Sequence, residues 1–331
     1  MKKSIHISIV IVALSFQFFF SSWGTFGHEH INRAAVLALP DSMRSFFFNH
    51  IDFITQESTV PDLRKYTLLD KTEIPKHFID LEKFGAMDSI PRNFDEATLK
   101  YKPEFLNEYG ILPWYIQDMM NKLTKAFKGK RKTEILFLAA DLGHYIGDAH
   151  MPLHTSVNHD GQLTDQRGIH ALWESKLPEM FGSGYNYHIK EAIYINDVQA
   201  FTWDFIFHSF KLADTVLLTD KQLRRQFSNE EIFQTDGKGN IKKNKFNQPV
   251  FTEAYAEQYH EALEGMVEKQ MRNAIFAISC YWYTAWVNAG KPDLSDLDPP
   301  YVTKQNQPAL EDALRVLKYG KLNGIESEKE F

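Results

Sequence analysis

The sequence has very little cysteine and no excess of positive charge. Its 331 residues include one cysteine, Cys280, so an intramolecular disulfide cannot form and zinc sites made of several thiolates are excluded. The 37 lysines and arginines are outnumbered by 43 aspartates and glutamates, which gives a net charge of −6. A protein that binds duplex DNA would carry a basic excess. Any contact of this chain with nucleic acid must therefore be local or mediated by metal ions.

Alternating β-strand patterns are also scarce, and we find no internal repeat or domain linker. Apolar residues recur instead at helical spacing. The predicted helices cover residues 31–39, 104–127, 133–150, 201–227 and 253–289, and a loop rich in Gly, Asn and Lys is expected at 234–249. The sequence therefore predicts an all-α fold, with a single mainly helical domain over residues 23–300 and a polar C-terminal tail over 301–331.

The first 22 residues have the features of a signal peptide. Two N-terminal lysines precede an apolar run over residues 7–20, and two serines follow it, as in the charged and apolar regions of a secretory signal. The run of roughly 14 residues is short for a membrane span, which needs about 20; a single membrane anchor is the alternative. We predict export to the periplasm or the extracellular space, with cleavage between Ser22 and Trp23.

The most informative stretch lies between residues 142 and 154. His144 and Asp148 are four residues apart on a predicted helix, so both side chains lie on one face and can share a metal ion. Pro152 cannot continue that helix. The turn that follows can return His154 to the same cavity.

A second pair repeats this spacing, because His170 and Glu174 are again four residues apart. One such pair alone would more often be a surface ion pair or a capping interaction. Two pairs that flank a further histidine, His154, are hard to obtain by chance. Imidazole and carboxylate are the ligands that leave zinc open for catalysis, whereas structural zinc prefers thiolate. The set therefore predicts a catalytic metal site.

Three shorter segments carry further candidates. Residues 77–80 read His-Phe-Ile-Asp, and Asp62 precedes them by about 15 residues. Either segment alone would more often be a polar loop. Residues 23–28, Trp-Gly-Thr-Phe-Gly-His, directly follow the predicted cleavage point. They are candidates for the same site; the alternative is that they form only a mature N-terminus followed by an N-capped helix.

In order and spacing these residues resemble a known superfamily, which contains the zinc-dependent single-strand-specific nucleases of fungi and plants and the bacterial zinc-dependent phospholipases C. The similarity runs from Trp23 to about Gly290. It implies a helical fold with three zinc ions in a surface cleft. The implied ligands are Asp62, His77, His144 and Asp148 for one zinc, His154, His170 and Glu174 for the second, and the free amine and carbonyl of Trp23 with His28 and the bridging Asp148 for the third.

The resemblance is divided between the two branches. In the nuclease branch, the Phe that corresponds to Phe78 stacks on a base, and the Asp that corresponds to Asp80 forms a hydrogen bond with the base edge. The nuclease pattern tends to have Arg three residues after the first Asp, where this sequence has Lys65 beside Arg64. Glu174 resembles the phospholipase branch instead, because nucleases usually have Asp at that position.

Three other residues near these motifs receive weaker assignments. Residues 158–161, Asn-His-Asp-Gly, are predicted to form a turn near the site, with Asn158 as a candidate substrate contact. His150 lies two residues after Asp148 and points away from its helix face, so we expect it to pack or to form a supporting hydrogen bond. His30 is expected to be exposed.

Together these features predict an exported phosphodiester hydrolase with three zinc ions. Asp148 would bridge two zincs, and Arg64 or Lys65 would add positive charge near the phosphate. The favoured substrate is single-stranded nucleic acid or nucleotides, cleaved by an endonuclease with 3′-nucleotidase activity. The alternatives are a phospholipase C that acts on phospholipids and a secreted, zinc-stabilised binding protein without turnover. The protein is expected to be a monomer without an obligate protein partner.

Overall fold

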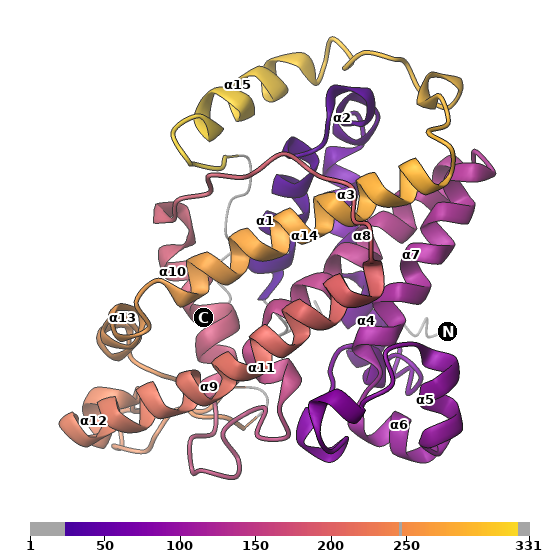
Figure 1. Cartoon of the computed structure of the whole chain (residues 1–331). Coiled ribbons are helices and arrows are strands. Elements are labelled where there is room, and N and C mark those ends of the chain that lie inside the picture. Colours follow the sequence, from indigo (N-terminus) through magenta and orange to yellow (C-terminus); the bar gives the residue numbers. More distant parts are fainter. Residues whose placement is uncertain (1–23, 245–246, 324–331) are drawn as a thin grey trace, which may run out of the picture.

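The computed structural model describes residues 24–244 and 247–323, and its fold is all-α, as predicted (Figure 1). Within these ranges β-structure is limited to three isolated antiparallel bridges between residues 233 and 251. Among the described helices, none is both long and apolar enough to cross a bilayer. The predicted signal peptide and Trp23 lie outside the described residues.

The helices are mostly short, with four longer ones that form the centre of the domain. The α-helices are α1 (Gly24–Leu37), α2 (Asp41–Phe48), α3 (Ile51–Glu57), α4 (Val60–Tyr66), α5 (Phe94–Lys100), α6 (Pro103–Tyr109), α7 (Leu112–Lys128), α8 (Lys132–His150), α9 (Ile169–Ala171), α10 (Leu177–Phe181), α11 (Val198–Leu223), α12 (Asn229–Ile232), α13 (Glu253–Ala262), α14 (Met266–Asn288) and α15 (Gln307–Leu317). The 3₁₀-helices are η1 (Ile74–Lys76), η2 (Leu81–Lys83), η3 (Met87–Ser89), η4 (Pro152–Thr155), η6 (Gly182–Gly184), η7 (Arg224–Gln226) and η8 (Leu294–Asp296), and η5 (Leu172–Lys176) is a π-helix.

Helix α8 is the central element of the domain. It packs against α1, α3, α7, α11 and α14, and Figure 1 shows the long helices α11 and α14 on the near side of the molecule. Every residue of α8 from Leu142 to His150 is buried. A helix that is buried on every side is a core element, so the polar side chains on this part of α8 must find their partners inside the protein.

The predicted helix over residues 104–127 is in fact two helices, α6 and α7, with Gly110 between them. Gly110 adopts a φ of 88°, and a Cβ atom there would lie 2.0 Å from the carbonyl oxygen of Phe78. The amide of Leu112 donates to that carbonyl at 3.2 Å, and the amide of Asp80 donates to the last carbonyl of α6 at 2.8 Å. A continuous helix would lose these contacts, so the break holds the Phe78 segment in place.

The predicted helix over residues 253–289 is also divided, into α13 and α14. Glu264 and Gly265, between the two helices, adopt φ angles of 51° and 76°, which an α-helix does not allow. The remaining predicted helices correspond to α1, α8 and α11, and the predicted loop at 234–249 contains no helix among its described residues.

Ordered structure continues beyond Pro300, where a polar tail was predicted. Leu310 and Ala313 of α15 are buried, and the amide of Tyr187 donates to the carbonyl of Gly320 at 2.6 Å. Figure 1 shows α15 along the upper edge of the domain, on the side of α2. Leu310, Ala313, Leu314 and Leu317 recur at helical spacing, so the sequence does carry the signal of this helix although a tail was predicted there.

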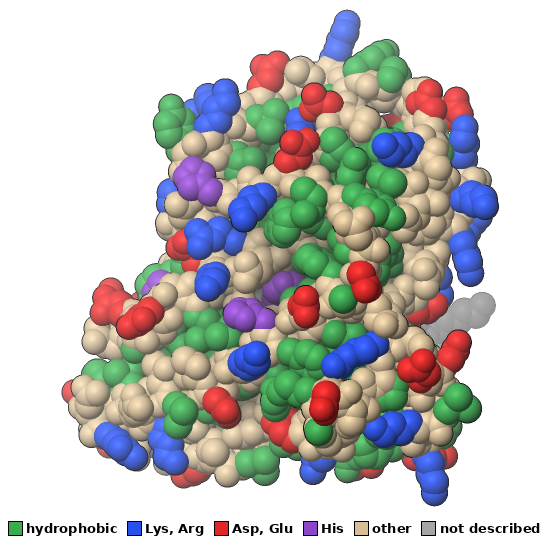
Figure 2. Space-filling view, in the orientation of Figure 1, with side chains coloured by type: hydrophobic (Ala, Val, Ile, Leu, Met, Phe, Trp, Pro, Cys, Tyr) green, Lys and Arg blue, Asp and Glu red, His purple; other side chains and the backbone are tan. Residues whose placement is uncertain are grey.

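The face of the molecule that carries α11 and α14 has a mixed charge pattern. Figure 2 shows acidic and basic side chains interspersed over it.

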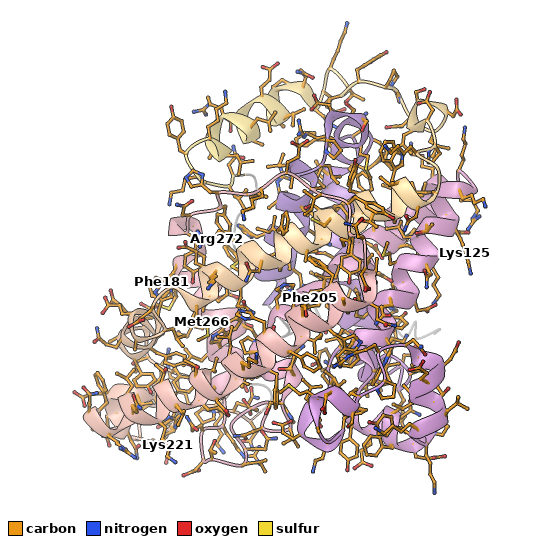
Figure 3. The ribbon with its side chains drawn as sticks, viewed as in Figure 1. Lys125, Phe181, Phe205, Lys221, Met266 and Arg272 are labelled. Atoms are coloured by element: carbon orange, nitrogen blue, oxygen red, sulfur yellow. The ribbon has the colours of Figure 1, made fainter. Side chains whose placement is uncertain are left out.

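Phe205, labelled on α11 in Figure 3, stacks on His150 of α8 with ring centroids 4.8 Å apart. His150 also donates from Nδ1 to the carbonyl of Ile146 at 2.8 Å, which confirms its predicted packing role.

The prediction that His30 is exposed is wrong. Its ring is buried and stacks on Phe26 with centroids 3.7 Å apart, and Nδ1 donates to the Phe26 carbonyl at 2.7 Å. Burial lowers the pKa of His30 to about 4, so the ring is neutral at physiological pH. His30 is therefore a core residue of α1.

Candidate metal centre and substrate cleft

Two glycines of α8 allow α1 to approach the polar face of α8. A Cβ atom at Gly143 would lie 2.0 Å from the side chain of Asn32. One at Gly147 would lie 3.2 Å from the ring of His28. Without these Cβ atoms the helices pack closely enough for the rings of His28 and His144 to stack, with centroids 3.9 Å apart.

Beside this contact lie five side chains that we call the inner group: His28, Asp62, His77, His144 and Asp148. Nδ1 of His77 lies 2.9 Å from Oδ2 of Asp148 and 3.1 Å from Nε2 of His144. Oδ1 of Asp62 lies 3.6 Å from Nδ1 of His77 and 4.0 Å from Nε2 of His144. All five side chains are buried, so the predicted ligands from α1, α4, α8 and the residue after η1 do converge.

The outer group consists of His154, His170 and Glu174. Pro152 begins η4, which turns the chain after α8 and brings His154 back towards Glu174 on η5. Nε2 of His170 lies 2.9 Å from Oε1 of Glu174. Nε2 of His154 lies 3.4 Å from Oε2 of Glu174 and 3.3 Å from Nε2 of His170. His154 and Glu174 are buried, whereas the side chain of His170 is 18% exposed.

Backbone carbonyls fix the tautomer of three histidines in these groups. The Nδ1 atoms of His144, His154 and His170 lie 2.8, 2.8 and 2.7 Å from the carbonyl oxygens of Ser58, His77 and His159, respectively. A carbonyl oxygen can only accept, so each Nδ1 carries a proton and donates it. In a neutral ring, Nε2 then presents a lone pair to the histidine and carboxylate atoms of its own group. A cation between these atoms would remove the repulsion between the lone pairs.

Two carboxylates of these groups lack ordinary partners. In the described part of the chain, both oxygens of Glu174 and Oδ1 of Asp62 are buried and accept no hydrogen bond. Burial alone would raise the pKa of Glu174, but His170 and His154 hold it below its usual range. A buried, ionised carboxylate needs a positive charge beside it, which either a protonated imidazole or a metal ion supplies.

The donor atoms therefore fit metal ions. Three sets of side chains have ligand atoms within 4.8 Å of one another: His28, His144 and Asp148; Asp62, His77 and His144; and His154, His170 and Glu174. All of these donors are imidazole nitrogens or carboxylate oxygens. Such a donor set is typical of catalytic rather than structural zinc.

Asp148 contacts histidines through both of its oxygens. Oδ2 faces His77 and lies 3.3 Å from Nε2 of His144, while Oδ1 lies 3.4 Å from Nε2 of His28. Burial would raise the pKa of Asp148, but His144 and His154 hold it well below its usual range. A carboxylate with its two oxygens against different histidines has the geometry needed to bridge two metal ions. The bridging role stays a prediction.

Sequence reasoning missed Glu73, a buried carboxylate behind His77. Glu73 accepts from Nζ of Lys76 at 2.8 Å and from the hydroxyl of Tyr145, and it lies 3.5 Å from Nε2 of His77. That nitrogen is on the side of the ring away from the inner group. A carboxylate in this position orients a metal-binding histidine and increases its basicity. The four-residue spacing between Glu73 and His77 is the signal that could have revealed the contact.

Arg64, a predicted catalytic cation, belongs to an ion-pair network with Glu73. Its Nη2 donates to Oδ2 of Asp141 at 2.7 Å and lies 3.3 Å from the hydroxyl of Tyr145, and its Nε lies 3.5 Å from Oε2 of Glu73. These contacts occupy the guanidinium and favour a structural role. The role of Arg64 at the phosphate stays a prediction without support from its contacts.

A cleft of about 680 Å³ adjoins both groups. His77 of the inner group and His154 and His170 of the outer group line it. Two predicted substrate residues, Phe78 and Asp80, and the predicted cation Lys65 also line it. The cleft thus joins the candidate metal ligands to a cation, an aromatic ring and a carboxyl group.

Asp80 differs from an ordinary surface aspartate. Burial, and then the nearby charge of Glu82, raise its pKa to about 6, against a smaller opposite effect of Lys83. Its backbone amide donates to the last carbonyl of α6. Two residues earlier, the carbonyl of the half-buried Phe78 accepts from the first amide of α7. The side chains of residues 78 and 80 are therefore presented to the cleft on a fixed backbone.

Asn158, a predicted substrate contact, is not among the described residues that line the cleft. Its Nδ2 donates to Oγ1 of Thr164 at 3.0 Å, and its Oδ1 accepts from the amide of Leu163 at 2.8 Å. The amide of Gly161 donates to the Asn158 carbonyl at 3.1 Å, which confirms the predicted turn. The side chain of Asn158 thus supports its own loop, and nothing in its contacts favours a role at the substrate.

A family model described as S1/P1 Nuclease matches residues 23–288. The matched range extends from the predicted mature N-terminus to the end of α14 and includes every side chain of the inner and outer groups. No curated protein matches the chain.

Proposed function

Because the chain belongs to the S1/P1 nuclease family, whose members are zinc-dependent hydrolases of phosphodiester bonds, we propose that it is an exported endonuclease for single-stranded nucleic acid with 3′-nucleotidase activity. One observation carries this proposal. Two groups of histidines and carboxylates, with imidazole lone pairs directed at one another, adjoin a single cleft that Phe78 also lines. Export rests on the N-terminal apolar run.

We assign three zinc ions to these groups. Asp62, His77, His144 and Asp148 would hold the first, and His154, His170 and Glu174 the second. His28 and Asp148 would hold the third together with the amine and carbonyl of Trp23, which lies outside the described residues. Zinc at these positions would activate water for attack on phosphorus and offset the negative charge of the phosphate oxygens.

Lys65 is the side chain that we assign to the phosphate. It lines the cleft, and although burial favours the neutral amine, Tyr66, Asp62 and Asp148 raise its pKa. Lys65 therefore stays protonated at any physiological pH. A fixed positive charge beside the phosphate stabilises the charge that develops during hydrolysis.

Phe78 and Asp80 are the residues that we assign to the base. An aromatic ring stacks on any nucleobase and contributes about 1–3 kcal/mol per base. The carboxylate of Asp80 accepts hydrogen bonds from donors on the base edge. Bases within a duplex are already paired and stacked, so a site of this kind favours single strands.

A phospholipase C is the second candidate, because apolar side chains are exposed on the loop after α4. Leu68 and Leu69 are 73% and 74% exposed, and Tyr66 and Ile74, which line the cleft, are 36% and 40% exposed. Exposed apolar residues beside a cleft are a feature of surfaces that bind lipid. Nuclease activity remains the first choice because the family model that matches is that of the nucleases.

The test is a substrate panel for the zinc-loaded protein, with and without a chelator. The panel contains single-stranded DNA, a duplex of the same sequence, a nucleoside 3′-monophosphate and a phosphatidylcholine emulsion. We expect chelator-sensitive cleavage of the single strand, about tenfold or more faster than of the duplex, as stacking on exposed bases requires. Hydrolysis of the emulsion alone would support the phospholipase. Zinc binding without turnover on any substrate would support a binding protein.

A further inference from the structure

Arg167 is a cleft residue that the proposed function has not yet used. It lies three residues before His170 in the sequence and lines the cleft together with His170 and His159. Its side chain is exposed. Within residues 24–244 and 247–323, no ion pair or hydrogen bond engages its guanidinium. The cleft thus contains a cation without an anionic partner beside the outer group.

The backbone on both sides of Arg167 is firmly held. The side chain of Gln166 is buried and donates from Nε2 to Oδ2 of Asp220 at 2.6 Å and to the carbonyl of Leu217 at 2.8 Å. Gly168 adopts a φ of 90°, and a Cβ atom there would lie 3.2 Å from the carbonyl oxygen of Pro249. Because its neighbours are fixed, binding through Arg167 has to order only its own side chain and not the backbone that carries it.

The carboxylate that shares this part of the cleft is already occupied. Oδ1 of Asp160 accepts from the amides of Gly168 at 2.9 Å and His170 at 3.3 Å. Oδ2 accepts from Nε2 of Gln248 at 3.0 Å. Asp160 therefore holds the loop and the backbone of His170, and its charge is directed at these donors rather than at Arg167.

We propose that Arg167 binds the phosphate next to the scissile one on the same strand. The inner group, the outer group and Lys65 would surround the scissile phosphate, and Arg167 extends the line of positive charge past His170. A guanidinium matches phosphate through two parallel hydrogen bonds, which a lysine cannot form. This inference rests on the proposed nuclease function. It makes the enzyme more efficient on strands than on substrates with one phosphate.

The experiment compares two thymidine substrates that differ in the number of phosphates. A dinucleoside monophosphate has only the scissile phosphate, whereas a tetranucleotide also has neighbouring ones. Arg167→Gln removes the charge, and Arg167→Lys keeps the charge but not the paired hydrogen bonds. Arg225→Gln is the matched control, because Arg225 is exposed and is not among the described cleft residues.

We expect Arg167→Gln to lower kcat/KM on the tetranucleotide about tenfold and on the dinucleoside monophosphate less than about twofold. The slope of log kcat/KM against log salt should become smaller by about 0.7 on the tetranucleotide alone, as expected for one lost phosphate contact. Arg167→Lys should keep the slope and lose part of the rate. Arg225→Gln should behave like the unmodified protein.

Equal losses on both substrates, or no loss on either, would overturn the subsite. So would an unchanged salt slope in Arg167→Gln on the tetranucleotide. An unmodified protein that cleaves neither thymidine substrate would overturn the proposed nuclease function, and the subsite with it. The two failures are therefore distinguished by the activity of the unmodified protein.

Discussion

The inner and outer groups perform similar chemistry but are assembled by the fold in different ways. The inner group draws on residues from His28 to Asp148, carried by α1, α4, α8 and the segment after η1, and all of its side chains are buried. The outer group lies within residues 154–174, and its His170 reaches the cleft. Tertiary packing therefore makes the inner group, whereas one turn of the chain and one helical spacing make the outer group.

This difference has a consequence for metal exchange. A metal ion held by the inner group would reach the cleft only past His77, because all five side chains of that group are buried and His77 is its one described member that lines the cleft. A metal ion in the outer group exchanges through the cleft beside His170. We expect a chelator to remove the outer metal ion first and the two inner metal ions more slowly, at a rate set by local opening.

The largest expected effect is that of Asp148→Asn. The substitution keeps the volume but removes the charge that faces two sets of histidines. Since a catalytic metal ion contributes several kcal/mol, we expect activity to fall about a thousandfold or more and at least one zinc per chain to be lost. Metal analysis and hydrolysis of a single-stranded oligonucleotide measure both. Asp118→Asn, on the exposed surface of α7, is the control. Normal rates with a full complement of zinc in Asp148→Asn would refute the bridging role.

Glu174→Gln should have a smaller and more selective effect. The outer group would lose its charged ligand and its zinc, while the inner group would keep its metal, so we expect activity to fall about a hundredfold. Zinc per chain before and after partial chelation gives the measurement. If this variant loses the inner metal as well, the two groups are not independent, and the comparison between them fails.

Glu73→Gln tests the support of the inner group from behind. Loss of the charge at Nε2 of His77 should weaken zinc binding by the inner group about 10–100-fold, the usual cost of removing such a partner. The helical content of the metal-free protein should not change. A competition titration with a chromogenic chelator measures the affinity, and Glu134→Gln at the exposed start of α8 is the control. Unchanged affinity in Glu73→Gln would mean that packing alone orients His77.

Phe78→Ala separates substrate binding from metal chemistry. Lost stacking of about 1–3 kcal/mol should reduce kcat/KM on single-stranded DNA about tenfold or more. Hydrolysis of a small phosphodiester without a base should change little. Phe94→Ala, which removes another aromatic ring that is 42% exposed, is the control. Equal losses on both substrates would assign Phe78 to packing instead.

The smallest expected effect is a pH dependence of base preference through Asp80. Its pKa is raised to about 6 by burial and by Glu82, so the carboxylate is ionised above that pH and neutral below it. The ionised form accepts two hydrogen bonds from the edge of guanine, and the protonated form accepts fewer. The preference for guanosine over adenosine 3′-monophosphate should therefore rise with pH, by up to about tenfold between pH 5 and pH 7.

The preference is measured as the ratio of kcat/KM for the two nucleotides. This ratio cancels any effect of pH on the metal ions, because both substrates share them. In Asp80→Asn the ratio should be independent of pH, because the amide does not titrate in this range. A pH-dependent ratio that persists in Asp80→Asn would assign the titration to another group.

Sequence spacing was sufficient to predict the local part of the site. His144 and Asp148, and likewise His170 and Glu174, are neighbours because they lie four residues apart on helical backbone, and Pro152 forces the turn that returns His154. The outer group was therefore accessible from the spacing of its residues. For the inner group, the distant partners Asp62 and His28 came from the resemblance to a family rather than from spacing.

What the sequence could not reveal depends on contacts between distant segments. Gly110 interrupts a helical pattern because the Phe78 carbonyl occupies the space of a Cβ atom, and no local signal records that carbonyl. Arg64 is held by Asp141, and His30 is buried by the packing of α1. The break at Gly110 and the contacts of Arg64 are each decided by a partner far away in the sequence.

In the proposed function, the inner and outer groups hold the zinc ions that carry phosphodiester hydrolysis. The most direct test is a zinc titration of the chelator-stripped protein, followed by hydrolysis of a single-stranded DNA oligonucleotide. We predict no hydrolysis without metal. Full activity should return when the number of zinc ions bound per chain rises to two and then three. Hydrolysis at the full rate by protein stripped of metal would contradict a role of these groups in zinc-dependent hydrolysis.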